Sequence, residues 1–172
     1  VSVSLSTTTR ASSMSEAELQ PYGGAEQGGK GARMQALGAL TLGCEGRELA
    51  ELGLLAEAGA LGFSNGASPV AALHVISRAL TYARSTGMAV CLGHTDGVWG
   101  EPGVIGGELS ASMGLGGVPA LAEVMAIERD LRLVEMTGVK AHFDMVTSSE
   151  GVAAIREAKA RGLPVTAGTG IA

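Results

Sequence analysis

The chain has 172 residues, of which 46% are hydrophobic and 17% are charged. This balance excludes a disordered chain and predicts a single domain with a buried core. The formal net charge is −5 without a basic cluster, which argues against a nucleic-acid partner. No apolar run reaches the roughly 20 residues that span a bilayer. The two cysteines, Cys44 and Cys91, lie far apart in the sequence, as is typical of reduced thiols in a cytoplasmic protein.

Short apolar runs alternate with longer amphipathic segments from the start of the chain. Residues 1–5 alternate between Val or Leu and Ser, the period of a strand. A short helix is predicted at residues 13–20, followed by a Gly-rich break at residues 22–31. A second strand is predicted at residues 36–42. The chain therefore opens with strand, helix and strand in turn.

The same alternation continues through the middle of the chain. A helix is predicted at residues 47–58, ended by Gly59, and a strand at residues 60–64. The apolar positions of that helix fall on one face, at Leu49, Leu52, Leu55 and Ala56. A longer helix runs from Pro69 to Thr86, where Gly87 ends it. The apolar run at residues 88–92 is typical of a strand that is buried on both faces.

The last third begins with a long Gly-rich loop over residues 93–107. The strongest predicted helix covers residues 118–137, with an exposed Glu128–Arg132 pair. Its expected core-facing residues are Leu121, Val124, Met125, Ile127, Leu131 and Val134. The remaining predictions are a strand within residues 139–146, a helix at residues 150–160 capped by Ser148 or Ser149, and a strand from residue 164.

Six strands separated by helical connections predict an α/β fold with a parallel sheet. Residues 1–172 are expected to form one domain. A complete eight-stranded barrel typically needs about 250 residues, which is more than this chain has. The sequence therefore leaves two architectures open, a six-stranded open sheet and a barrel that lacks its ends. Two unpaired parallel edges would also make the chain oligomeric or poorly stable alone.

Several segments resemble the dihydroorotase and allantoinase branch of the amidohydrolase superfamily. The similar segments are GALTLGCEGRELAELGLLAEAGALGFSNGASPV, VCLGHTDG, GGVPALAEVMAIERDLRLVEMTG and HFDMVTSSEGVAAIREAKARGLPVTAG. They cover most of the chain from about residue 36 onward, and their order and spacing agree with the family. The resemblance implies an incomplete parallel (β/α) barrel of TIM type, with strands two to seven of the family barrel. The family reaction is metal-assisted hydrolysis or closure of a cyclic amide, with zinc as the metal.

The resemblance also assigns positions to a metal site. His94 matches the family's metal-binding histidine after the fifth strand, although a loop histidine with only local hydrogen bonds would look the same. Asn65 stands where the family has an aspartate or a carboxylated lysine, and Asn65-Gly66 also reads as a common turn pair. Met145 stands at the metal-binding histidine of the sixth strand, and a thioether is a poor ligand for zinc. Met145 is therefore expected to fill the core.

Three further positions complete these expectations. His142 matches the first histidine of the family's sixth strand, and Thr7 stands where an asparagine helps to hold the substrate. Thr7, Asn65 and His142 are therefore candidate substrate contacts. Asp144 is not expected to replace the missing ligand, because side chains alternate along a strand. His74 falls inside a predicted helix, at a surface or packing position.

Three functions remain open from the sequence. The first is a non-catalytic dihydroorotase-like protein of pyrimidine biosynthesis, which binds zinc weakly or not at all. Its partner would be aspartate transcarbamoylase or a second copy of the chain, as the resemblance implies. The second is a fragment of an active zinc amidohydrolase whose missing ligands lie outside the chain. The third is an α/β domain that binds a small molecule around His94 and His142.

Overall fold

In a computed structural model, the described residues are 36–66, 70, 72–93, 104–115 and 117–169. Five strands form one parallel sheet in the order β1-β2-β3-β6-β7. They are β1 (Gly38–Ala39), β2 (Gly62–Ser64), β3 (Ala89–Leu92), β6 (Lys140–Phe143) and β7 (Val165–Ala167). The expected strand at residues 1–5 and helix at residues 13–20 lie outside the described residues.

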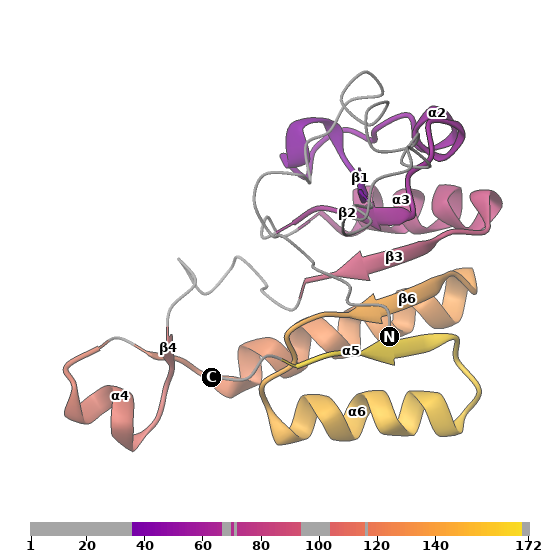
Figure 1. Cartoon of the computed structure of the whole chain (residues 1–172). Coiled ribbons are helices and arrows are strands. Elements are labelled where there is room, and N and C mark those ends of the chain that lie inside the picture. Colours follow the sequence, from indigo (N-terminus) through magenta and orange to yellow (C-terminus); the bar gives the residue numbers. More distant parts are fainter. Residues whose placement is uncertain (1–35, 67–69, 71, 94–103, 116, 170–172) are drawn as a thin grey trace, which may run out of the picture.

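Four helices connect and cover this sheet. They are α2 (Leu52–Glu57), α3 (Leu73–Thr86), α5 (Ala120–Thr137) and α6 (Ser149–Ala160). Each helix in this series packs against the next one, so all four lie on the same face of the sheet (Figure 1). None of the described helices is both long and apolar enough to cross a membrane.

The strand order distinguishes between the two architectures that the sequence left open. A doubly wound sheet reverses its strand order at one point and carries helices on both faces. Here the strands follow one another in chain order and the helices cover one face, as in a barrel wall. The described sheet is therefore part of a parallel (β/α) barrel of TIM type, as the resemblance predicted.

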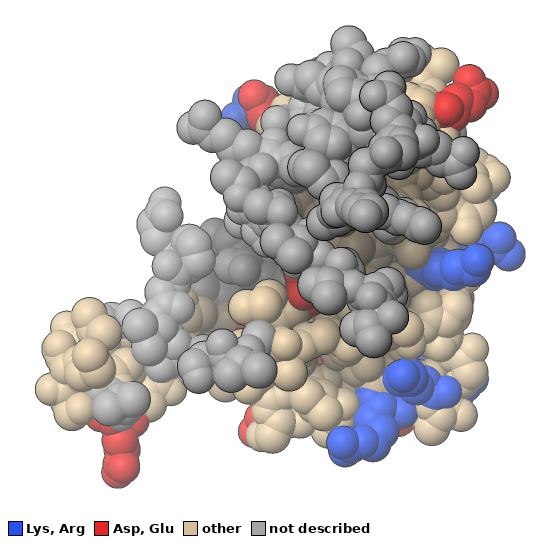
Figure 2. Space-filling model, viewed as in Figure 1, with Lys and Arg blue, Asp and Glu red and all other residues tan. Residues whose placement is uncertain are grey.

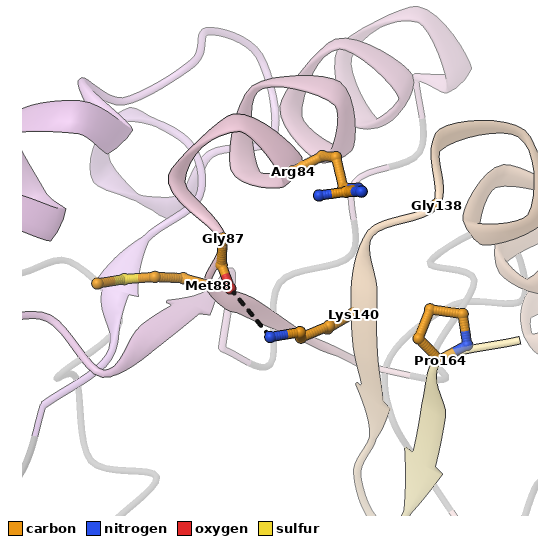
Figure 3. Close-up of a pocket in the computed structure, with 6 residues that line it drawn as sticks. All are labelled: Arg84, Gly87, Met88, Gly138, Lys140 and Pro164. Carbon is orange, nitrogen blue, oxygen red and sulfur yellow. Dashed lines mark hydrogen bonds between the residues drawn. The ribbon is translucent and has the colours of Figure 1, made fainter.

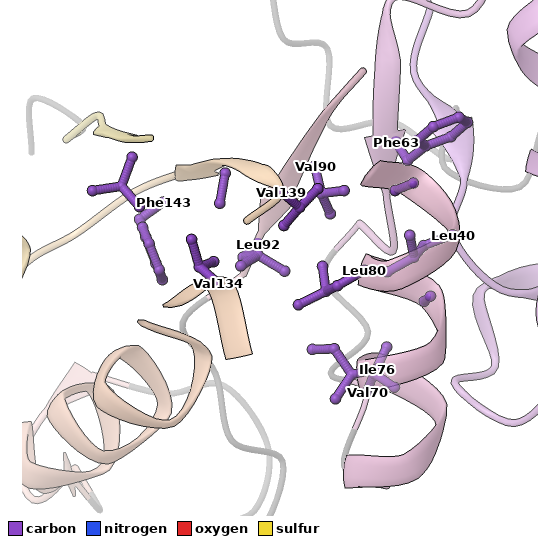
Figure 4. Close-up of a cluster of buried hydrophobic side chains, with 14 of the residues drawn as sticks. Leu40, Phe63, Val70, Ile76, Leu80, Val90, Leu92, Val134, Val139 and Phe143 are labelled. Carbon is purple, nitrogen blue, oxygen red and sulfur yellow. The ribbon is translucent and has the colours of Figure 1, made fainter. Parts of the chain in front are cut away.

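The hydrophobic core lies between the sheet and its helices. Side chains alternate along a strand, so Val90 and Leu92 of β3 and Ala141 and Phe143 of β6 point toward the helices and are buried. Figure 4 shows some of these side chains meeting residues of α3 and α5, including Leu80 and Val134. The opposite face of the sheet carries the alternating residues, which are more polar and less buried.

Helix ends follow the predicted signals. Gly87 and Gly138 end α3 and α5 in the left-handed region, with φ values of 75° and 67°. Ser148 caps α6, and its side chain accepts a hydrogen bond from the backbone N–H of Gly151. Helix α2 begins at Leu52 rather than at residue 47, because Leu49 is still extended and forms an antiparallel bridge with Thr41.

One helix buries a different face from the predicted one. Leu121 and Met125 of α5 are 57% and 47% exposed, so the prediction that they face the core was wrong. The buried face contains two acidic residues, Glu123 and Asp130, which the apolar pattern could not reveal. The expected Glu128–Arg132 pair is replaced, because Arg132 contacts Glu135 at 3.3 Å.

The segment between β3 and α5 is more structured than the predicted loop. It contains a small unit in which β4 (Val104–Ile105) pairs in parallel with β5 (Gly117–Val118). A short helix, α4 (Glu108–Ser112), connects these two strands. Figure 1 shows this unit standing apart from the main sheet, on the side toward which the strands point.

Candidate functional site

A row of polar side chains crosses the open face of the sheet, near the carboxyl ends of its strands. Ser64, Cys91, His142 and Thr166 occupy matching positions on four neighbouring strands. His142 Nδ1 lies 2.8 Å from Thr166 Oγ1, so the two side chains share a hydrogen bond. Interior layers of such barrels usually consist of bulky apolar residues. This polar row therefore marks the open face as a candidate binding surface.

The side chains of His142 and Asp144 both lie close to the backbone of Gly168. A Cβ atom at Gly168 would lie 3.5 Å from His142 Nε2 and 3.7 Å from Asp144 Oδ1. Both polar atoms therefore lie near the same point of the chain, where a glycine presents no side chain. Burial raises the pKa of the nearby Cys91 thiol, and the negative charge of Asp144 raises it further. Cys91 is consequently protonated at neutral pH and a weak nucleophile.

Asn65, at the carboxyl end of β2, is part of a buried hydrogen-bond network. Its Oδ1 accepts a hydrogen bond from Thr41 Oγ1 at 2.5 Å, and its Nδ2 donates to the carbonyl oxygen of Cys44 at 3.1 Å. Thr41 Oγ1 also accepts from the backbone N–H of Gly46. Asn65 is 7% exposed. Its amide therefore closes the turn after β1, and both ends of the amide are used within the chain.

Met145 lies after β6 in an unusual backbone conformation. Its φ is 57°, in the left-handed region that few residues other than glycine adopt, and its side chain is 49% exposed. The prediction that Met145 fills the core was therefore wrong. The left-handed turn directs the side chain away from the helix-facing core, which the sequence pattern did not indicate.

The remaining predicted site residues divide into two groups. Thr7 and His94 lie outside the described residues. His142 lies on the open face of the sheet, where its role as a substrate contact stays a prediction, and His74 is exposed on α3. The structure thus brings His142 and Asp144 together at one edge and separates Asn65 from them within its own network.

The described side chains at this edge of the sheet can be compared with the zinc ligands that the resemblance implies. Within the described ranges, no three His, Cys, Asp or Glu side chains are grouped closely enough to hold a metal ion. Asn65 is neutral and already engaged, and the Met145 sulfur is a soft donor. The described residues at this edge do not fit a catalytic zinc site.

A surface hollow of about 260 Å³ lies at the opposite end of the sheet, where the strands begin. Its lining residues are Arg84, Gly87, Met88, Gly138, Lys140 and Pro164 (Figure 3). Figure 2 shows Lys and Arg side chains gathered on this side of the molecule. Arg84 lies in the last turn of α3, and Lys140 Nζ donates to the carbonyl oxygen of Gly87 at 3.5 Å. These cations stabilise helix carboxyl ends, which accounts for them without a ligand.

Glu123 was missed by sequence reasoning, although it contacts the loop beside the candidate site. It accepts hydrogen bonds from Thr147 and Ser148, which follow β6. Its neighbours in the sequence are apolar or small, so the residue looked like one solvated charge on an amphipathic helix. The helical period, with residues 122, 126 and 127 also buried, was the available signal.

Comparisons with known proteins place this chain in a family. The model of the family "Dihydro-orotase-like" matches residues 27–151. A "Dihydroorotase-like protein" from Pseudomonas aeruginosa is 40% identical over 136 residues, covering 78% of this chain and 32% of its own length. A "Dihydroorotase" from Pelotomaculum thermopropionicum is 44% identical over 132 residues, covering 76% of this chain and 31% of its own length.

Solved structures agree on the fold. "L-Hydantoinase (Dihydropyrimidinase) from Arthrobacter aurescens" matches with a TM-score of 0.66 at 16% identity, covering 92% of this chain and 37% of that protein. "Structure of D-hydantoinase" matches with a TM-score of 0.56 at 22% identity, over 69% of this chain and 28% of that one. The chain spans about a third of the length of the curated relatives that it matches. From the family match and these relatives, we conclude that the chain belongs to the dihydro-orotase-like family.

Proposed function

We propose that this protein is a non-catalytic dihydroorotase-like protein, with a structural role in pyrimidine biosynthesis. The observation that carries the proposal is the use of Asn65. At the position of a family metal ligand, its side chain is buried and bonded to Thr41 and Cys44. A neutral, buried amide that is already bonded at both ends is a poor ligand for zinc.

The position of Met145 supports the same proposal. A neutral thioether replaces the imidazole that the resemblance implies there, and the side chain is half exposed. The two positions would then supply no charged or imidazole donor to a metal that activates water. The protein would then act through its surfaces, with aspartate transcarbamoylase or a second copy of this chain as partner in the cytoplasm.

A turnover assay tests this proposal. The purified protein, supplied with zinc, is incubated with dihydroorotate and separately with N-carbamoyl-L-aspartate, and interconversion is followed by chromatography. We expect no conversion above a protein-free control, while an active dihydroorotase run in parallel reports that the assay works. Zinc-dependent turnover would overturn the proposal. If no turnover is found, two further measurements identify the partner. Co-purification would identify aspartate transcarbamoylase, and the mass of the particle in solution would show whether copies of this chain associate.

One observation favours a second candidate, an active zinc amidohydrolase. The chain spans only 31–34% of the length of these relatives. Ligands for zinc would in that case come from His94 and from segments beyond this sequence. The turnover assay separates the two candidates directly, provided that it is run on the full gene product.

The closeness of His142 and Asp144 to Gly168 favours a third candidate, the binding of a small polar molecule without chemistry. His142 Nε2 and Asp144 Oδ1 would supply hydrogen-bonding atoms of the kind that a ureido or carbamoyl acid needs. Stabilisation by N-carbamoyl-L-aspartate in a thermal-shift assay would support this candidate. An unchanged melting temperature at millimolar ligand would argue against it.

A further inference from the structure

Glu123, in the first turn of α5, binds the loop that follows β6. Its Oε1 accepts hydrogen bonds from the backbone N–H groups of Thr147 at 3.0 Å and Ser148 at 2.8 Å, and from Ser148 Oγ at 2.7 Å. Its Oε2 accepts from the same Thr147 N–H at 3.2 Å and from the Thr147 hydroxyl. Glu123 as a whole residue is 7% exposed, and its one side chain accepts from four donors.

The surroundings of this carboxylate are closely packed. A Cβ atom at Gly151 would lie 3.0 Å from Glu123 Oε1 and 2.8 Å from both Ile127 Cδ1 and Ser148 Oγ. A larger residue at position 151 would therefore force the side chains of Ile127, Ser148 or Glu123 to shift, and glycine avoids this. Ser148 already caps α6 by accepting from the Gly151 N–H, so the helix cap does not require Glu123. The hydrogen bonds to Glu123 therefore have a role other than capping α6.

The loop that Glu123 binds carries one wall of the candidate site. Residues 144–148 connect Asp144 to the capped start of α6. On the other side, the backbone N–H of Val146 donates to the carbonyl oxygen of Gly168 at 2.9 Å, and the N–H of Gly168 donates to Phe143 at 2.9 Å. The loop is thus fixed between α5 and the end of β7.

We propose that Glu123 is a positioning residue, which holds residues 144–148 so that His142 and Asp144 keep their arrangement above Gly168. Ligand binding by His142 and Asp144 rests on the small-molecule role described under the proposed function. The positioning itself rests only on the contacts above. A glutamine at this position would place an amide N–H₂ group against donors, and the loop would lose at least one of its two backbone anchors.

Amide hydrogen exchange followed by NMR tests the anchoring. Glu123→Gln is compared with Glu128→Gln, a matched control because Glu128 is exposed on the same helix. We expect the amides of Thr147 and Ser148 to exchange at least tenfold faster in Glu123→Gln, while those of Ala141 and Phe143 are unchanged. Glu128→Gln should behave as the parent protein does. Should Glu123→Gln fail to fold, Thr147→Val removes one hydroxyl bond and provides the same test with a smaller effect.

The imidazole signal of His142 distinguishes positioning from a merely structural contact. The chain has three histidines, so His142→Gln assigns the signal. We expect Glu123→Gln to shift this signal, and Glu128→Gln to leave it in place. An unchanged His142 signal, despite faster exchange at Thr147 and Ser148, would overturn the proposal and leave Glu123 as a loop anchor alone. A titration with N-carbamoyl-L-aspartate that perturbs no signal would instead count against the ligand role and leave the positioning intact.

Discussion

The residues that follow β2 and β6 stand at two positions to which the resemblance assigns a metal ligand, and their surroundings differ. After β2, Asn65 turns into the protein and joins a buried network with Thr41 and Cys44. After β6, Met145 turns outward in a left-handed conformation and contacts solvent. One position has acquired a structural role within the fold, whereas the other is exposed. Substitutions at the two positions should therefore have opposite effects on stability.

The largest expected effect is at the end of β2. Asn65→Asp removes the donor to the Cys44 carbonyl and places a carboxylate oxygen against it in a buried site. We expect the free energy of unfolding in urea to fall by about 3 kcal/mol. Thr41→Ser is the matched control, because it keeps the hydroxyl that Asn65 accepts from, and it should cost much less. A stable Asn65→Asp variant would show that the network is not required and would reopen the metal-ligand role.

The anchor at the end of β6 should make stability depend on pH. Burial by itself would raise the pKa of Glu123, but the hydrogen bonds from Thr147 and Ser148 outweigh it and lower the pKa below its ordinary value. The charged carboxylate therefore stabilises the fold fully above its unfolded pKa of about 4.3, and this contribution is lost as the pH falls through the lower folded value.

Urea denaturation between pH 7 and pH 3 measures this contribution. Glu123→Gln should be less stable than the parent at pH 7, and the difference should shrink toward pH 3. Glu150→Gln is the control. A hydrogen bond from Ser149 also lowers the pKa of Glu150, but the Glu150 carboxylate is fully exposed. A constant difference between Glu123→Gln and the parent at all pH values would show that the charge is unimportant.

The smallest effect is expected at Met145 itself. Glycine adopts the left-handed region without a steric penalty, so Met145→Gly should raise the free energy of unfolding by about 1 kcal/mol. The control is Met136→Gly, because Met136 is exposed within helix α5 and glycine is unfavourable there. Thermal melts that show both variants destabilised equally would contradict the assigned conformation of Met145.

Much of the fold could be predicted because local signals agreed with one another. The apolar run before residue 92, the glycines at 87 and 138 and the serine cap at 148 all lie where an α/β repeat requires them. The buried face of α5 could not be predicted in the same way. Its acidic residue Glu123 finds its partners 24 and 25 residues away, and no local pattern shows such a contact.

The candidate site was predictable only in part, for a similar reason. The resemblance identified Asn65 and Met145 as substituted positions, and the Asn-Gly pair suggested a turn. It did not indicate that the Asn65 amide binds Thr41 across 24 residues, or that Met145 is exposed. Hydrogen bonds between distant segments and single left-handed residues follow from tertiary structure rather than from local periodicity.

The metal content of the purified protein tests the central claim most directly. The protein is dialysed against zinc, separated from free metal by gel filtration and analysed by mass spectrometry of the elements. If the ends of β2 and β6 have lost their ligand roles, zinc should remain well below one equivalent per chain, and Met145→His alone should not restore it. One or more tightly bound equivalents in the parent protein, lost on replacing His142 or His94, would contradict the account.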